Sequence, residues 1–168
     1  MRLYLSRRGD YAVRAMLALA VHRGEDRLSV RRIAAQMAIP VRFLPQVMRD
    51  LVASGLVVSH EGRTGGYQLA RPASAISLYD VVVAAEGERD QQECVLRGGP
   101  CRRDGICAVH PALTEAREAA RRRLAAISLA ELARNFEIIA AGGSLGDLSP
   151  RPTRPLVTTP GHGPDLDG

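Results

Sequence analysis

The stretch SVRRIAAQMAIPVRFLPQVMRDLVASGLVVSHEGRTGGYQL, residues 29–69, decides the fold of this chain. Its first part has helical periodicity after Ser29, a favoured N-cap residue, and Ile39-Pro40 ends that pattern. A second helical pattern follows, with five apolar residues at helical spacing on one face. These are Phe43, Leu44, Val47, Met48 and Leu51. We therefore expect two short helices joined by a tight turn.

Pro45 constrains where the second of these helices begins. A proline is tolerated in the first turn of a helix but removes a hydrogen bond and clashes further in. We therefore expect the helix to begin near Phe43 or Leu44. Gly55 then ends it.

After Gly55 the periodicity changes from helical to that of short strands. LVVSH (56–60) and YQLAR (67–71) are strand-like, and EGRTGG between them holds three glycines, which give a hairpin turn its backbone freedom. Upstream, DYAVRAMLALAVH (10–22) predicts one more helix, ended by Gly24. Three helices followed by a hairpin are the order of a winged helix-turn-helix.

Downstream of the hairpin the pattern is again helical. Ser77–Asp80 opens a short helix through about residue 85, and Ser128–Glu131 resembles a capping box that starts a last helix ending near residue 140. Between them, residues 111–127 predict a long helix with an apolar stripe. The stripe consists of Leu113, Ala116, Ala120, Leu124 and Ile127. We expect it to pair with a second copy of the chain, since it needs cover.

The predicted fold is mainly α with a small β-hairpin: a winged helix-turn-helix plus a long dimerisation helix. We divide the chain into a DNA-binding domain (1–85), a cysteine loop (86–108), a dimerisation and C-terminal helix pair (109–141) and a disordered tail (142–168). The tail is rich in glycine, proline and threonine, which do not build a core.

Basic charge is concentrated in the first half of the chain. Residues 1–71 contain 12 arginines against 5 acidic residues, whereas residues 72–168 contain 11 arginines against 13 acidic residues. A one-sided basic surface favours a polyanion, most often nucleic acid, although a solvated arginine surface remains the alternative.

A winged helix-turn-helix inserts its second helix into the major groove of double-stranded DNA. Arg42 and Gln46 are the candidates for base edges, guanine and adenine respectively, and Arg49 for a phosphate. Arg63 would occupy the wing tip and enter a minor groove. Further backbone clamps are expected from Arg31 and Arg32 on the supporting helix and from Arg2, Arg7 and Arg8 at the first helix. The alternative is a winged helix that binds a protein.

All three cysteines fall in the polar loop, as Cys94-x6-Cys101-x5-Cys107, with His110 just beyond. Thiolates are the usual protein ligands of iron–sulfur clusters. The spacing fits no zinc ribbon, because it contains no CxxC. An odd number of cysteines also argues against a disulfide framework.

The segments YAVRAMLALA, IPVRFLPQVMRDL and GGYQLA resemble the IscR/NsrR family of winged-helix regulators, within the Rrf-two superfamily, over about residues 1–135. The resemblance implies a homodimer on a partly palindromic operator, with a cluster held by Cys94, Cys101 and Cys107. It offers two fourth ligands: His110 in a 2Fe–2S site, or Asp10 of the other subunit in a 4Fe–4S site. Without the resemblance, Asp10 would be an N-cap and His110 the start of the long helix.

Two departures from the family pattern bear on the operator. Pro45 stands where the family commonly has Glu, and Glu61-Gly62 stands where its wing often reads Arg-Gly. We expect an operator sequence that differs from those of better-known relatives.

The sequence thus predicts a DNA-binding transcriptional regulator, a repressor, whose operator affinity is controlled by a cluster that senses redox state, nitric oxide or iron. The alternatives are a cluster-carrying or thiol-redox interaction protein and a cluster-free regulator that senses oxidants through its thiols. We find no catalytic motif, and no apolar run approaches the ~20 residues that span a bilayer. No signal peptide is recognised either, so a cytoplasmic protein without a membrane partner is expected. His22 and His60 are expected on the surface.

Overall fold

The computed structural model describes residues 5–22, 27–62, 65–87 and 109–142. The DNA-binding part contains α1 (Arg7–Val21), α2 (Val30–Gln36), α3 (Leu44–Ala53), β1 (Val57–His60) and β2 (Gly66–Leu69). A short 3-10 turn, η1 (Ala73–Ala75), leads to α4 (Leu78–Glu86), and α5 (His110–Ala125) and α6 (Leu129–Ala140) follow. This order confirms the mainly α fold with a two-stranded hairpin.

The local signals in the sequence place most helix ends correctly. Ser29 caps α2 by accepting a hydrogen bond from the N–H of Arg32, and Pro45 lies in the first turn of α3, which begins at Leu44. Ser77 and Asp80 form a reciprocal capping box at α4. These devices act within one helical turn, so they are readable from sequence.

The first helix begins earlier than the sequence pattern suggested. Its N-cap is Ser6, whose hydroxyl accepts a 3.1 Å hydrogen bond from the N–H of Gly9. The prediction that Asp10 could be the N-cap is therefore wrong, because Asp10 lies within the first turn. The backbone N–H of Ser6 also donates to Glu86 Oε1 at 2.7 Å, which ties this helix end to the end of α4.

The hairpin is attached to the helices by a third short backbone pairing. β1 and β2 are antiparallel, with Val57 opposite Leu69. On its other edge β2 pairs with Leu28: the N–H of Leu28 donates to the Tyr67 carbonyl at 3.0 Å, and the N–H of Tyr67 donates to the Leu28 carbonyl at 2.9 Å. The wing is therefore anchored to the segment that enters α2.

The core is aliphatic and lies between α1, α2, α3 and α4. Leu44, Val47 and Leu51 are buried as predicted. Phe43, which shares their helical spacing, is 41% exposed, because it precedes the first turn of α3 and does not face the core. His22 and His60 differ from expectation, since both are half-buried, with Nε2 atoms covered from solvent.

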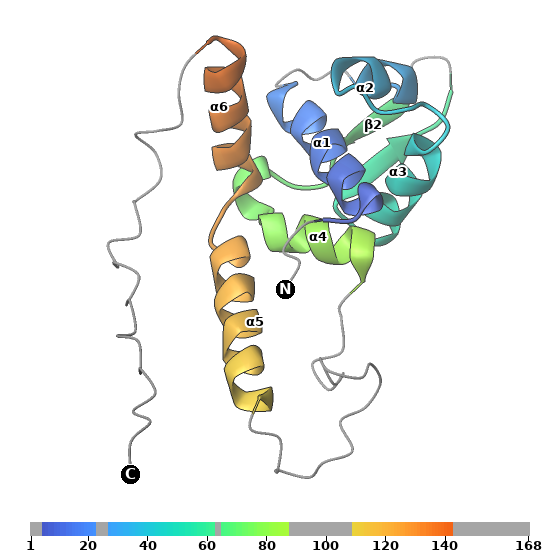
Figure 1. Cartoon of the computed structure of the whole chain (residues 1–168). Helices are drawn as coiled ribbons and strands as arrows, with labels where there is room; N and C mark the ends of the chain where they lie inside the picture. The colour runs from blue at the N-terminus through green and yellow to red at the C-terminus, as the bar shows by residue number, and fades with distance from the viewer. Residues whose placement is uncertain (1–4, 23–26, 63–64, 88–108, 143–168) are drawn as a thin grey trace, which may run out of the picture.

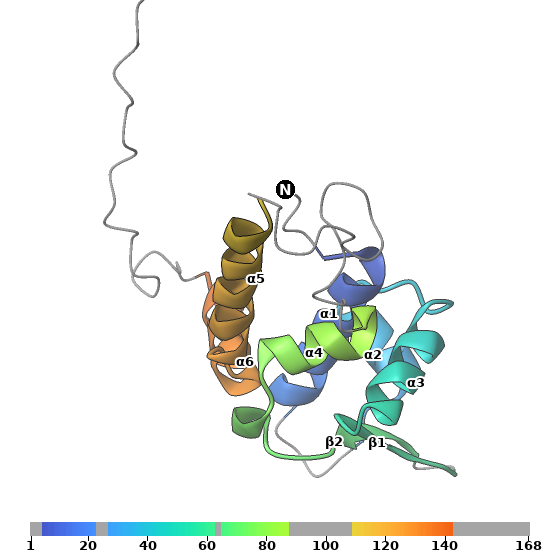
Figure 2. The same cartoon turned by 90° about the horizontal axis from the view of Figure 1, so that it is seen from below.

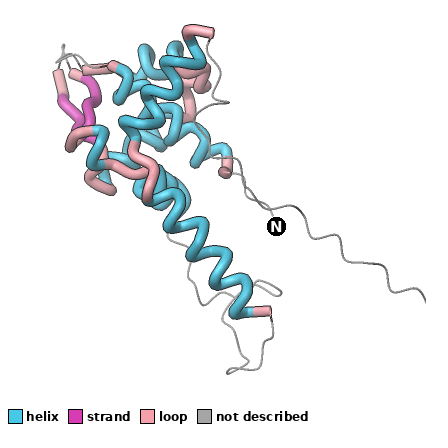
Figure 3. Tube along the Cα trace, turned by 90° about the vertical axis from the view of Figure 1, so that its left-hand side faces the viewer, coloured by secondary structure: helices cyan, strands magenta, loops and turns pink. Residues whose placement is uncertain are grey.

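The last two helices have different relations to this core. α6 lies beside α1 and contributes buried Leu129, whose N–H donates to the carbonyl of Ile76 at 2.7 Å. α5 contains no buried residue and projects from the body (Figures 1 and 3). The expected C-cap Gly24 and the tail after residue 142 lie outside the described residues.

Candidate nucleic-acid interface

The candidate DNA-contacting side chains are exposed on α2, on α3 and on the turn between them. Arg31 and Arg32 are exposed on α2, Arg42 is exposed in the turn, and Gln46 and Arg49 are exposed on α3. The hairpin lies at the end of α3 (Figure 2). Wing residue Arg63 lies outside the described residues. The structure thus brings five of the six predicted residues onto two neighbouring helices and their connection.

Arg42 stands over an aromatic ring. Its guanidinium carbon lies 4.7 Å from the ring centroid of Phe43. Phe43 also stacks on Tyr11 of α1, with ring centroids 5.9 Å apart and planes at 27°. Offset stacking and cation–π contacts both occur at such separations. The candidate base-reading arginine is thus supported from α1.

Gln46 is hydrogen-bonded to Asp50, which in turn forms an ion pair with Arg8 of α1. Its Nε2 donates to Asp50 Oδ1 at 3.1 Å, one turn along α3. Asp50 Oδ2 accepts from Arg8 Nε at 3.0 Å and from a terminal guanidinium nitrogen of Arg8. The amide keeps its oxygen and one N–H, the two groups that pair with adenine.

The Arg8 guanidinium, expected to clamp a phosphate, is engaged by Asp50 in the structure. Asp50 itself was not predicted as a functional residue. The spacing of Gln46 and Asp50, four residues apart on a helix, is the one signal in the sequence that points to their contact. The ion pair with Arg8 joins residues 42 positions apart and has no such signal.

Asp10 lies within α1, and its carboxylate forms an ion pair with Arg14. Arg14 Nε donates to Asp10 Oδ1 at 2.9 Å, and a terminal guanidinium nitrogen donates to Oδ2. The second terminal nitrogen, Nη1, donates to the backbone carbonyl of Met37 at 3.3 Å, and the guanidinium carbon lies 5.9 Å from the Tyr11 ring centroid. Asp10 thus helps to hold Arg14 against the end of α2 and the aromatic pair.

The proposed cluster ligands lie only partly within the described structure. Cys94, Cys101 and Cys107 are outside it, and the described residues contain no group of three metal-ligating side chains. His110 is half-buried at the first position of α5, whereas Asp10 lies in the first turn of α1. Three thiols with a histidine or a carboxylate fit an iron–sulfur cluster chemically. A cluster at Asp10 would compete with Arg14 for the carboxylate.

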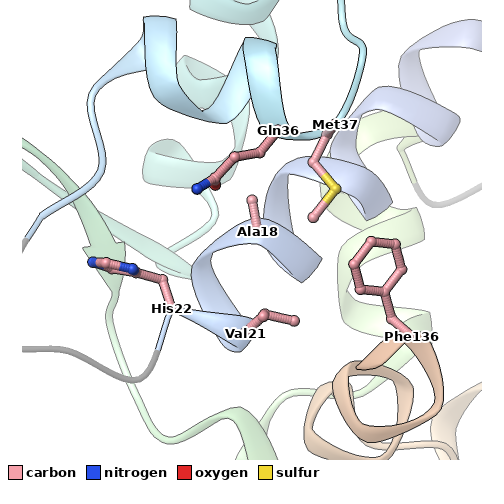
Figure 4. Close-up of a pocket in the computed structure, with 6 residues that line it drawn as sticks. All are labelled: Ala18, Val21, His22, Gln36, Met37 and Phe136. Atoms are coloured by element: carbon pink, nitrogen blue, oxygen red, sulfur yellow. The ribbon is translucent and has the colours of Figure 1, made fainter. Parts of the chain in front are cut away.

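A separate pocket of about 300 Å³ lies between α1, α2 and α6. Figure 4 shows Met37 reaching toward Phe136, with Ala18 and Val21 beneath and Gln36 and His22 at the other end. Its walls come from the ends of α1 and α2 and from one side chain of α6. The pocket therefore lies where the C-terminal end of α2 and the middle of α6 both approach the C-terminal end of α1.

Comparison with known proteins decides the family. The Rrf2 family model, described as an iron-dependent transcriptional regulator, matches residues 5–135. The chain belongs to the Rrf2 family. Protein rrf2 of Nitratidesulfovibrio vulgaris is 34% identical over 134 residues, which are 80% of this chain and 89% of that protein. The regulator IscR of Photorhabdus laumondii is 33% identical over 139 residues, 83% and 84% of the two chains.

Two solved structures of bacterial regulators share the fold. CymR, the global cysteine regulator of B. subtilis, superposes with a TM-score of 0.67 at 28% identity, covering 80% of this chain and 98% of CymR. IscR of T. potens gives 0.67 at 27% identity, covering 87% and 96%. The protein is accordingly a DNA-binding transcriptional regulator with a winged helix-turn-helix. No helix in the described part of the chain has the length and apolar character needed to span a membrane.

Proposed function

We propose that this Rrf2 protein reads its operator with Arg42 and Gln46 on base edges, while Arg49, Arg31 and Arg32 contact phosphates and Arg63 enters a minor groove. The observation that carries this proposal is the support given to the first two side chains. Both side chains are exposed, yet the Arg42 guanidinium stacks on Phe43 and the Gln46 amide donates a hydrogen bond to Asp50. Side chains ordered before binding lose less conformational entropy on the DNA.

The proposed regulator is a homodimer joined by α5. None of the residues of α5 is buried, although the helix carries the apolar stripe Leu113, Ala116, Ala120 and Leu124, all half-buried. Arg117 and Arg121–123 are exposed beside it. A second α5 packed on the stripe would remove its apolar surface from water, and a twofold axis would present two recognition helices to a partly palindromic site.

The proposed signal is read by an iron–sulfur cluster on Cys94, Cys101 and Cys107, as the resemblance to the IscR/NsrR family implies. The cluster would supply a group that changes state with redox, nitric oxide or iron supply. With Asp10 of the partner subunit as fourth ligand, binding would take a carboxylate away from Arg14, which contacts the end of α2. With His110, the first turn of α5 would be involved instead. The regulated output would be repression.

The cluster is tested by anaerobic purification of the full chain, with iron and sulfide analysis and visible spectroscopy. We expect a brown protein whose iron is lost in the triple variant Cys94→Ser, Cys101→Ser, Cys107→Ser. An iron-free wild type prepared with adequate iron and sulfide would contradict this part of the proposal, and a cluster-free thiol sensor would then be favoured.

The fourth ligand is assigned by comparing Asp10→Asn with His110→Ala. The variant that removes the true ligand should lose or alter the cluster spectrum, and the other should keep it. Because Asp10→Asn also weakens the pairing with Arg14, Arg14→Gln is the matched control: it breaks the same ion pair and leaves the carboxylate in place. If Arg14→Gln alters the cluster as much as Asp10→Asn, Asp10 is not assigned as a ligand.

DNA reading is tested by the salt dependence of binding to a selected operator. Replacing Arg49, Arg31 or Arg32 with Ala should reduce the slope of log K against log salt by about 0.9 each, because each phosphate contact releases a counterion. Arg42→Ala should instead relax the base preference at one position. Unchanged slopes and unchanged base preferences in these variants would overturn the assignment.

A further inference from the structure

Phe43 is an apolar aromatic side chain that is substantially exposed to solvent. It is one of only two phenylalanines in the chain, and it is 41% exposed immediately before the helix that reads DNA. The core of the helix-turn-helix is filled by aliphatic side chains and does not include it. Burial of apolar surface therefore does not account fully for a phenylalanine here.

Arg42, Phe43, Tyr11 and Arg14 form a stacked ladder that runs from the turn before α3 to α1. One neighbour of the Phe43 ring is Tyr11, at 5.9 Å between centroids, and the Arg42 guanidinium lies 4.7 Å from the Phe43 centroid. Tyr11 is in turn approached by the Arg14 guanidinium at 5.9 Å. Arg14 is fixed by Asp10 and by the Met37 carbonyl, so the ladder has a firm base on α1.

We propose that Phe43 and Tyr11 are positioning residues, which hold the Arg42 guanidinium ready for a guanine in the major groove. This inference rests on the proposed function, in which Arg42 contacts a base. A free arginine samples many rotamers, and a contact to guanine O6 and N7 needs one planar orientation. A guanidinium stacked on an aromatic ring loses part of that freedom before DNA arrives.

The proposal separates the aromatic character of residue 43 from its bulk. Leucine keeps apolar volume but has no ring, so Phe43→Leu should weaken the hold on Arg42, whereas Phe43→Tyr should retain it. Phe136→Leu is the matched control, because Phe136 is the other phenylalanine, is similarly exposed at 37%, and lies on α6.

The experiment uses the full-length protein and an operator recovered by wild-type selection from a random duplex pool. We expect Phe43→Leu to weaken operator binding by about two- to five-fold, the effect of one cation–π contact at an exposed site. It should also reduce the preference for one base pair, the same one that Arg42→Ala affects. Binding to unrelated DNA should not change, because the charge of Arg42 remains.

Tyr11→Leu should give the same loss at the same base pair and serves as a second variant if Phe43→Leu is poorly folded. The double variant Arg42→Ala, Phe43→Leu should lose little more than Arg42→Ala alone, since the positioning residue acts through the arginine.

Two different failures are distinguishable. If Arg42→Ala leaves every base preference unchanged, the proposed reading by Arg42 is wrong and the inference falls with it. If Arg42→Ala alters a base preference but Phe43→Leu binds like Phe136→Leu, or if the two losses simply add, Arg42 reads DNA without help from the ladder and only the inference is overturned.

Discussion

Gly66 lies where the wing packs against the Leu28 backbone, and replacing it with alanine should disrupt the pairing of Leu28 with Tyr67. Gly66 has a φ of +156°, and an added Cβ would lie 2.8 Å from the backbone oxygen of Leu28 and 3.0 Å from its carbonyl carbon. Both atoms belong to the backbone, so no side chain can rotate away. The clash falls beside the pairing of Leu28 with Tyr67.

The loss of unfolding free energy can be estimated from the contacts that break when the Leu28 segment moves away from residue 66. Separating the segments would lose the two Leu28–Tyr67 hydrogen bonds, each contributing a net ~0.5–1.5 kcal/mol, or about 1–3 kcal/mol in all. The positive φ adds roughly 1–2 kcal/mol for an L residue. Gly66→Ala should therefore lower the free energy of unfolding by about 2–5 kcal/mol.

Gly55→Ala provides the matched control. Gly55 also has a positive φ, +71°, but nothing lies within 4 Å of its added Cβ, so it should lose only the roughly 1–2 kcal/mol of backbone strain. Chemical unfolding followed by circular dichroism, at one protein concentration, measures both variants. Equal destabilisation would refute the reasoning, because it would show that the contact with Leu28 contributes nothing. Operator affinity should fall further in Gly66→Ala than in Gly55→Ala.

Three further predictions follow from the contacts described above. Asp50→Asn should steepen the slope of log K for DNA binding against log salt by up to about 0.9, because Arg8 becomes free to contact a phosphate. Glu118→Gln, which breaks an ion pair on α5, is the control and should leave this slope unchanged. Ser77→Ala should lower the free energy of unfolding by about 1 kcal/mol through loss of the α4 cap, whereas exposed Ser74→Ala should be neutral in the same unfolding assay. Leu124→Glu should shift sedimentation equilibrium toward monomer, and a dimer as stable as that of Arg123→Glu would argue against pairing through the apolar stripe.

Much of the candidate site could be predicted because its residues are close in sequence. Gln46 and Arg49 lie on the exposed face of one short helix, and Arg42 lies in the turn two residues before it, so closeness in sequence alone places the three together. Their supporting residues could not be predicted in the same way. Tyr11 and Arg8 come from α1, and no local pattern indicates which exposed residues of a distant helix they contact.

Phe43 illustrates the limit of periodicity. It shares helical spacing with Leu44 and Val47, yet those two residues are buried and Phe43 is exposed. Spacing does not show that α3 begins at Leu44 and leaves Phe43 in the preceding turn, where its ring stacks on Tyr11. The contact with Tyr11, which lies 32 positions earlier in the chain, is set by the tertiary structure.

The sequence by itself determined the order of elements, the N-caps of α2, α4 and α6 and the winged helix-turn-helix, because capping, proline placement, glycine freedom and hydrophobic period act over a few residues. Only the tertiary structure decided that α6 adds Leu129 to the core, that Leu28 anchors the wing, and that α1 supports both candidate base-reading residues. Those contacts join segments far apart in the chain, and their partners are chosen by packing of whole elements rather than by any local preference.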